Sequence, residues 1–459
     1  MTMGLIHRSL LTSVSRLFAQ TATAVLTGTL LFSVAAAARA QDLQPPTLSV
    51  LYTFTGGPDG AIPGAGDGSA PLALDKEGDL YGTTGYGGSV TSPWCKVNPN
   101  CGVVFKVNRA GKESVLHAFT GPPDGNEPFD GVIRDEEGNL YGTTFIGGDA
   151  AQAAGTVFKL DGAGKETVLH NFANSPDGAG AWGGVIRDGE GNLYGTTWAG
   201  GDAPSEWGTV FKLDPAGKET ILYNFTGGAD GAGPSASLIR DCEGNLYGTT
   251  VSGGDGGAPG YNCTRNGVGC GVVFKLDPNG KETVLHSFTG GADGATPFGL
   301  TRVPDGTLYG VAAYGGGSFG PSTAGGSNGN GVVFKLEPQG KFSVLHTFTG
   351  GADGALPFGT PLRIGADIYG TAYAGGNQTS ALCGDYGCGV IYKLDANGNE
   401  TVLYTFSGYA DGDDPSQGLV TDGKGNLYGT TEYGGDIASP TPACYGYGCG
   451  VVFKLTLHY

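Results

Sequence analysis

The sequence predicts an all-β fold, and specifically a seven-bladed β-propeller made of four-stranded antiparallel blades. Three observations lead to this prediction: one unit recurs seven times, each copy reads as four short strands, and one further strand precedes the first copy. A length of 459 residues would otherwise suggest two or three domains. The repeat instead predicts a single propeller domain over residues 41–459.

Three short markers define the repeat, and they follow one another in the same order in every copy. Tyr-Gly-Thr-Thr, or a close variant, recurs every 53 to 62 residues and begins at Tyr81, Tyr141, Tyr194, Tyr247, Tyr309, Tyr369 and Tyr428. The Val-Phe-Lys marker centres on Phe105, Phe158, Phe211, Phe274, Phe334, Tyr392 and Phe453. The Asp-Gly marker begins at Asp59, Asp124, Asp177, Asp230, Asp293, Asp353 and Asp411. This regularity indicates one supersecondary unit that has been duplicated.

The fourth copy shows the expected strands, A to D, most clearly. They cover residues 238–240, 245–250, 271–276 and 283–288, which are rich in β-branched and aromatic residues. Glycine, Asn, Asp and Pro separate them, so the 89 glycines indicate many turns rather than low complexity. No segment keeps an apolar period of 3.6 residues, and helix is therefore expected to be scarce.

The two ends of the repeat array predict how it closes. A strand of type D, residues 49–54, stands before the first copy, and the last copy stops after its C strand at residues 451–455. Pairing the two would give every blade four strands and would remove both exposed sheet edges. An open solenoid would gain nothing from this arrangement, so we expect the N-terminal strand to complete the last blade.

Residues 1–40 predict an export signal that is cleaved after Ala40. Arg8 and Arg16 give a basic start, residues 21–38 form an uncharged apolar run, and Ala38-Arg39-Ala40 fits a small-x-small cleavage site. An uncleaved membrane anchor is the alternative, although the run is short and rich in alanine. The mature protein is expected to be secreted or periplasmic.

Composition limits the partners of the mature chain. The signal carries three basic residues and no acidic ones, so its removal lowers the formal net charge from −18 to about −21. Such a charge argues against nucleic acid and against anionic membranes as partners. The expected partner is a glycan or another extracellular ligand, bound by a monomer.

Eight of the nine cysteines form close pairs just before C strands. In an exported protein these pairs predict four disulfides that staple the long B–C loops: Cys95–Cys101, Cys263–Cys270, Cys383–Cys388 and Cys444–Cys449. Zinc is disfavoured at these pairs because each supplies only two thiols. Cys242 is left over as a free thiol or an intermolecular link.

The repeat resembles the GloVer tandem-repeat proteins, which are exported bacterial proteins of largely unknown function. The resemblance rests on the unit GNLYGTT…GG…GVVFKLD…GKETVLHSFTGGADG and covers nearly all of the mature chain. Members often carry a C-terminal anchoring segment, whereas this chain ends at Tyr459, four residues after strand C. The departure favours free secretion or a periplasmic location over surface attachment. The Asp-x-x-Gly-Asn-Leu-Tyr stretch is more weakly similar to NHL and streptogramin-lyase-like propeller repeats.

Function is expected on the propeller face that carries the B–C and D–A connections, because all long insertions fall there. Aromatic side chains concentrate in these connections, and flat rings beside carboxylates and amides suit the faces of sugar rings. The candidate ligand-binding residues are Trp94, Phe145, Trp182, Trp198, Trp207, Tyr314, Tyr373 and Tyr433. The alternative is that these rings only pin glycine-rich loops to the rim of the propeller.

The repeated polar residues are expected to be structural. An Asp before a Gly caps a turn with positive φ, although seven such loops leave calcium as an alternative. His117, His170, His286 and His346 share one strand position with Tyr52, Tyr223 and Tyr404, which indicates a slot for a planar ring with one hydrogen bond. We therefore expect no catalytic residue, no metal ligand and no obligatory cofactor among them.

Three classes of function remain open from the sequence. The first is a non-enzymatic module that binds a glycan or other extracellular ligand. The second is a polysaccharide or macrocycle lyase or hydrolase with its site at the mouth of the central channel, and the third is a structural surface or adhesion protein. An enzyme would need charges that occur in one or two copies only, such as Glu127, Glu206, Arg265, Asp385 and Glu432.

Overall fold

A computed structural model describes residues 44–65, 70–88, 92, 94–96, 101–149, 153–202, 206–255, 269–317, 329–378, 383–436, 444 and 446–458. The predicted export signal lies outside these residues. The chain divides into two compact units, one of residues 47–456 and one of the terminal stretches 1–46 and 457–459. The larger unit is the repeat array, and everything below concerns it.

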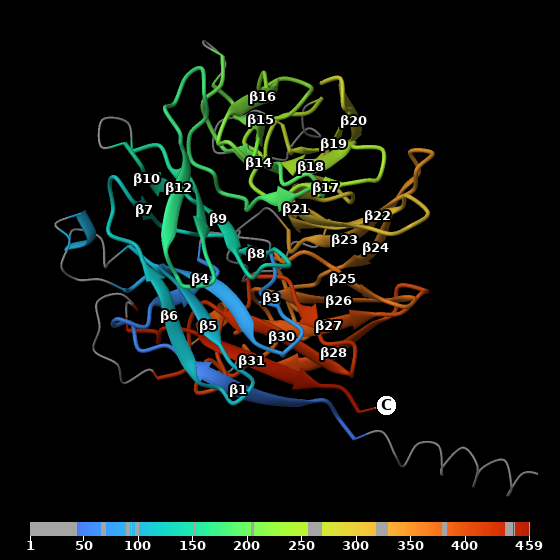
Figure 1. The fold of residues 1–459 in the computed structure, drawn as a ribbon. Coiled ribbons are helices and arrows are strands. Elements are labelled where there is room, and N and C mark those ends of the chain that lie inside the picture. Colours follow the sequence, from blue (N-terminus) through green and yellow to red (C-terminus); the bar gives the residue numbers. More distant parts are fainter. Residues whose placement is uncertain are drawn as a thin grey trace, which may run out of the picture. The chain divides into compact units, whose positions relative to one another are not determined.

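The repeat array forms seven antiparallel four-stranded blades in a ring, so the predicted β-propeller is confirmed (Figure 1). Blade 1 contains β3 (Ala73–Leu74), β4 (Leu80–Tyr86), β5 (Val103–Val107) and β6 (Glu113–Ala118). Blade 2 contains β8 (Ile133–Arg134), β9 (Leu140–Thr144), β11 (Thr156–Leu160) and β12 (Glu166–Asn171). Blade 3 contains β13 (Ile186–Arg187), β14 (Leu193–Thr197), β15 (Thr209–Leu213) and β16 (Glu219–Asn224). Blade 4 contains β17 (Ile239–Arg240), β18 (Leu246–Thr250), β19 (Val272–Leu276) and β20 (Glu282–Ser287). Blade 5 contains β21 (Ala295–Arg302), β22 (Leu308–Tyr314), β23 (Val332–Leu336) and β24 (Phe342–Thr347). Blade 6 contains β25 (Leu362–Ile364), β26 (Asp367–Ala372), β27 (Val390–Leu394) and β28 (Glu400–Thr405). Blade 7 contains β29 (Val420–Thr421), β30 (Asn426–Thr431), β31 (Val451–Thr456) and β1 (Thr47–Thr53).

Minor elements decorate this ring. The short strand β2 (Ala61–Pro63) pairs with β4, and β7 (Gly125–Asn126) pairs with β10 (Ile146–Gly147). Single 3₁₀ turns cover Trp94–Lys96 and Gly384–Tyr386. The described residues contain no α-helix, and hence no helix that could span a membrane.

The N-terminal strand closes the ring as predicted. Strand β1 pairs antiparallel with β31, with Thr47 opposite Thr456 and Thr53 opposite Val451. Figure 1 shows the blue β1 lying beside the red β31 in one blade. Blade 7 thus joins the first strand of the propeller to its last three, and β1 covers the edge of β31.

Each blade is joined to the next by one pair of buried aromatic rings. The second ring of the pair belongs to the Val-Phe-Lys marker on strand C, and the first follows strand D of the preceding blade. All seven contacts are edge-to-face, with ring centroids 5.1–5.5 Å apart: Phe54–Phe105, Phe119–Phe158, Phe172–Phe211, Phe225–Phe274, Phe288–Phe334, Phe348–Tyr392 and Phe406–Phe453. This is a preferred geometry for aromatic pairs, and it is the same at the closing contacts as inside the array.

The glycine of Tyr-Gly-Thr-Thr is required by these buried rings. Strand B crosses directly over the strand C ring, and a Cβ built on Gly142 would lie 2.6 Å from Cζ of Phe158. A contact this short has no room for a methyl group. The marker therefore reflects packing between strands B and C of the same blade.

Near its axis the ring is filled by polar side chains that link several blades. Asp130, which precedes strand A of blade 2, is buried and accepts hydrogen bonds from Ala70 N in blade 1, Gly184 N in blade 3 and Ser237 Oγ in blade 4. Only a residue close to the axis can reach blades on both sides and a third beyond them. Gln417 of blade 7 accepts bonds from Thr371 and Thr430 in a similar way.

Three of the predicted disulfides are present: Cys95–Cys101, Cys383–Cys388 and Cys444–Cys449. The fourth prediction, Cys263–Cys270, falls outside the described residues because Cys263 does. Cys242 is unpaired and exposed. The disulfides indicate that the protein matures in an oxidising environment.

Candidate ligand-binding face

The B–C and D–A connections emerge at one end of the ring, which we call the insertion face. Its inner part is built from the residue after each Tyr-Gly-Thr-Thr marker and from the D–A residue that pairs with it. Backbone hydrogen bonds hold these segments together, from Phe145 N to Glu127 O, from Trp198 N to Gly180 O and from Glu432 N to Asp414 O. The same frame thus presents a different side chain in each blade.

A continuous chain of aromatic rings crosses blades 2 and 3 on this face. Phe129 contacts Phe145 at 5.6 Å and Trp182 at 5.5 Å, and Phe145 contacts Trp182 at 4.9 Å between ring centroids. Trp198 continues the chain at 6.4 Å from Trp182. We call Phe129, Phe145, Trp182 and Trp198 the aromatic cluster, and three of the four are predicted site residues.

The aromatic cluster offers both an open ring face and an unused donor. Trp198 is 46% exposed, which is high for so large an apolar side chain in a packed fold. The indole nitrogen of Trp182 is buried and has no hydrogen-bond partner. Since buried polar groups normally find a partner, this unpaired N–H is an unusual feature of the cluster.

The other predicted site residues lie apart from this cluster. Trp94 is 54% exposed and packs its Cβ against Gly121, while Trp207 packs against Gly227 and the core of blades 3 and 4. Tyr314 packs against two neighbouring core clusters. Tyr433 packs against the same apolar cluster as Phe145 and Trp182, and its ring centroid lies 6.1 Å from that of Tyr447.

A group of carboxyls gathers beside Tyr373 at blades 6 and 7. Asp413 and Glu432 are buried, and the Asp414 carboxyl lies beside the Tyr373 hydroxyl. Among the described residues, no other copy has an acid at the Glu432 position, where Gly85 or Phe145 stands elsewhere. We call Asp413, Asp414 and Glu432 the acidic cluster.

Burial sets the protonation of the acidic cluster. Desolvation raises the pKa of Asp413 to about 6, and desolvation with the charges of Asp413 and Glu432 raises the pKa of Asp414 well above its usual range. The same surroundings raise the pKa of the Tyr373 hydroxyl. Burial therefore favours the protonated forms of Asp413 and Asp414, which can donate hydrogen bonds or a proton.

The charged residues that occur in only one or two copies lie in different surroundings in the structure. Glu432 belongs to the acidic cluster, and Glu127 is buried with a φ of 57° in the equivalent turn of blade 2. Glu206 is exposed, with a φ of 50°. Arg265 and the side chain of Asp385 lie outside the described residues. No two of these charges form a hydrogen-bonded pair in the part of the chain that is described.

The Asp-Gly turns and the strand D rings form one repeated structure. Each Asp carboxylate accepts the backbone N–H four residues before it, as Asp124 does from Thr120 N at 2.9 Å. The same carboxylate contacts the ring seven residues before it, as in Tyr52 Oη–Asp59 Oδ2 at 2.9 Å. The carboxylate thus caps the turn, and it is the single hydrogen-bond partner predicted for the strand D ring.

Sequence reasoning missed Phe129 and the coherence of the acidic cluster. Phe129 lies five residues after the Asp of its Asp-Gly marker, a position that holds Trp182, Phe298 and Phe358 in three other copies. Its importance comes from contacts with blades 1 and 3. Counting from the Asp-Gly marker would have grouped it with Trp182.

Comparison with known proteins identifies the repeat and the fold. The family described as the Gloeobacter/Verrucomicrobia repeat matches residues 96–320, 147–381 and 319–458. No curated protein matches the chain significantly. A streptogramin B lyase structure is similar over 91% of this chain and 99% of its own, with a TM-score of 0.52 and 13% identity.

Two further structures are similar at lower scores. A gluconolactonase from Xanthomonas campestris matches 70% of this chain and 89% of its own, with a TM-score of 0.35 and 13% identity. A luciferin-regenerating enzyme matches 71% of this chain and 90% of its own, with a TM-score of 0.41 and 14% identity. At such identities the likeness extends to the fold and not to the activity.

Proposed function

The chain belongs to the Gloeobacter/Verrucomicrobia repeat family, and from that premise we propose that this member is a secreted, non-enzymatic module that binds a glycan or another extracellular ligand on its insertion face. The disulfides support a location outside the reducing cytoplasm. The mature chain's excess of acidic residues favours a neutral or cationic ligand.

The aromatic cluster is the observation that carries this proposal. Its rings form a surface that spans two blades, with Trp198 open to solvent and the Trp182 N–H without a partner. Aromatic faces stack on the C–H faces of sugars, and a buried donor beside them gives orientation and specificity. A role in pinning loops alone would not require Trp198 to be exposed.

The test is a binding screen of the purified protein against a panel of polysaccharides and oligosaccharides. Trp198→Ala is expected to weaken binding at least about fivefold, because an aromatic hot spot contributes more than about 1 kcal/mol. Trp94→Ala is the matched control, since it removes an equally exposed indole that lies outside the cluster. Equal affinities of the two variants, or no saturable binding by the parent, would refute the proposed site.

The acidic cluster specifically favours the lyase or hydrolase alternative. A carboxyl whose pKa is raised by burial is suited to general acid catalysis near neutral pH. The same screen, read for new reducing or unsaturated ends, distinguishes the two functions. Product formation that Asp414→Asn abolishes would replace the binding function by an enzymatic one, with its site at blades 6 and 7.

A further inference from the structure

A set of three side chains meets at each contact between neighbouring blades, on the D strands. The set consists of the strand D ring, the Asp of the following Asp-Gly turn, and the first residue of strand D in the next blade. At three contacts these residues are His, Asp and Glu, and at two of the three their ligand atoms converge: His117, Asp124 and Glu166 between blades 1 and 2, and His170, Asp177 and Glu219 between blades 2 and 3. We call these two sets the interblade triads.

We propose that each interblade triad binds one divalent transition-metal ion of the zinc type. Among the described residues, one ligand atom from each of the three side chains of a triad lies within 4.8 Å of the other two. The ligand atoms of His346, Asp353 and Glu400 do not meet this condition. An imidazole with two carboxylates is a donor set used by zinc, and the imidazole disfavours calcium.

The distances within the triads are those of ligands around a shared ion. His170 Nε2 lies 3.3 Å from both carboxylate oxygens of Asp177 and 3.8 Å from Glu219 Oε2. His117 Nε2 lies 3.2 Å and 3.4 Å from the oxygens of Asp124. Charge-assisted hydrogen bonds are shorter, at about 2.7–2.9 Å. Two ligands bound tetrahedrally at about 2.0–2.2 Å lie about 3.3–3.6 Å apart, which these distances match.

In the described chain, the triad histidine is the only possible cation that faces the carboxyls of each triad. The Oε1 atoms of Glu166 and Glu219 are buried and have no hydrogen-bond partner, as is also true of Glu113, Glu282 and Glu400 at other contacts. In the described part of the chain, no Lys or Arg forms an ion pair with either triad. Two carboxylates that face each other repel, and a bound metal ion would offset that repulsion.

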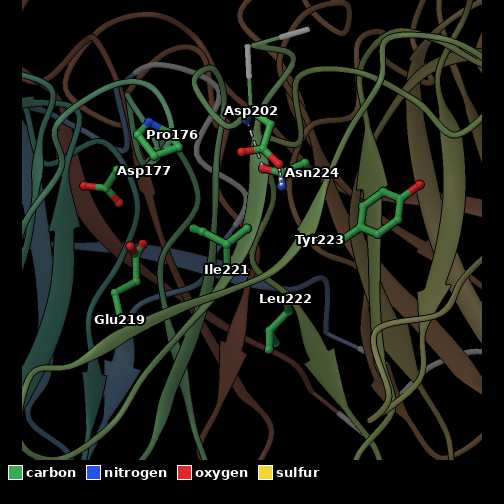
Figure 2. A pocket seen from close by; sticks show the side chains of 8 residues that line it. All are labelled: Pro176, Asp177, Asp202, Glu219, Ile221, Leu222, Tyr223 and Asn224. Atoms are coloured by element: carbon green, nitrogen blue, oxygen red, sulfur yellow. Dashed lines mark hydrogen bonds between the residues drawn. The ribbon is translucent and has the colours of Figure 1, made fainter. Parts of the chain in front are cut away.

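The ligands are held in position, and one triad is open to solvent. Backbone N–H groups fix the carboxylates, from Thr120 to Asp124 and from Ala173 to Asp177, each at 2.9 Å. Asp177 and Glu219 line an open cavity of about 570 Å³. Figure 2 shows their carboxylates directed toward one another, so an ion can enter between them.

The remaining repeats supply variants of the same frame. Where Tyr replaces His, its hydroxyl donates directly to the Asp carboxylate at 2.9–3.0 Å, as in Tyr52–Asp59 and Tyr223–Asp230. At the contact of blades 4 and 5, Phe342 stands in place of Glu and stacks on His286 at 3.8 Å. The fold therefore accepts a Tyr in the ring position and does not need the complete triad.

The test compares zinc retention by variants that the repeat itself suggests. Each protein carries Cys242→Ser to remove the exposed thiol, is stripped with a chelator, incubated with zinc chloride and gel-filtered before its zinc content is measured. The parent is expected to retain zinc, His117→Tyr and His170→Tyr each to lose one equivalent, and the double variant to lose two. Zinc should raise the melting temperature of the parent more than that of the double variant.

His286→Tyr is the matched control, because it makes the same exchange at a contact without the Glu. It is expected to retain as much zinc as the parent. A parent that retains no zinc overturns the proposal, and so does a folded double variant that retains as much as the parent. If His286→Tyr loses zinc equally, the ions are bound elsewhere and the proposal also fails.

Discussion

At the scale of single residues, the fold depends on glycines, which leave room for buried aromatic rings, as much as on the rings themselves. Gly142 lies over the buried Phe158 ring with no room for a Cβ, and Gly195 lies over Phe211 in the same way. Both partner rings are fully buried. Since rings of this size are the largest apolar groups in the interior, the glycine and the ring act as one packing unit.

Gly142→Ala is expected to destabilise the protein by about 1–3 kcal/mol, because a methyl group would force Phe158 out of place. The measurement is the free energy of unfolding in denaturant. Gly162→Ala is the control, since a Cβ there meets nothing within 4 Å. That exchange should be neutral or slightly stabilising through the unfolded state. Similar losses in both variants would contradict the packing argument.

At the scale of elements, strand D begins with a glutamate that packs against the preceding blade. Glu113 faces Asp59 and Tyr52 of blade 7, and Glu282 faces Asp230 and Tyr223 of blade 3. Burial and the facing aspartate raise the pKa of both Glu113 and Glu282 to about 7. The start of this strand therefore binds protons more tightly in the folded than in the unfolded chain.

This difference predicts that stability falls as pH rises. Below the unfolded pKa of 4.5 both states are protonated and the stabilisation is fully present; it is lost as pH rises through the folded pKa of about 7. Melting temperatures between pH 5 and 8 should therefore fall less in Glu113→Gln/Glu282→Gln than in the parent.

Glu136→Gln/Glu137→Gln changes two exposed glutamates of a turn by the same charge. Its melting temperature should follow the pH dependence of the parent. If this control flattens the curve as much as the strand D variant does, the effect reflects net charge and the interpretation of Glu113 and Glu282 is wrong.

At the scale of the whole molecule, β1 makes the ring complete. It covers the edge of β31 along most of its length, and Phe54 behind it packs on Phe105 of blade 1. Without it, blade 7 would expose an unpaired strand, and blade 1 would lose its buried ring contact. Exposed edges of this kind template association with other chains.

Deletion of residues 44–54 is therefore expected to lower the melting temperature and to cause oligomerisation, measured by calorimetry and light scattering. A synthetic peptide of residues 44–56, added in trans, should restore the monomer by adding the missing strand. A peptide with Phe54→Ala should restore it less well, because it pairs without filling the ring contact. Full stability of the deleted protein would show that closure does not depend on β1.

The sequence was sufficient for the fold because the repeat markers encode local packing. Each copy of Tyr-Gly-Thr-Thr and Val-Phe-Lys specifies the same strand pair, and the unpaired strand at residues 49–54 specified closure. Three disulfides followed from pairs of cysteines that are near in sequence. These features need no knowledge of how distant copies meet.

The candidate site was less predictable because it depends on contacts between copies. Trp94 and Trp198 have equal claims from the sequence, yet only Trp198 lies in the aromatic cluster. Phe129 and the acidic cluster gain their roles from their position near the axis, where several blades converge. The sequence pattern within one copy does not indicate how close to the propeller axis a residue lies.

The equivalence of the seven interblade contacts has a consequence for how such proteins diversify. Phe406–Phe453 and Phe54–Phe105, which flank the closing blade, have the same geometry as Phe172–Phe211 inside the array. Recombination between copies that gains or loses one internal unit would leave an aromatic pair of this geometry at every junction. The ring pair itself therefore accepts any internal unit as a neighbour, whatever the length of the insertion loops of that unit.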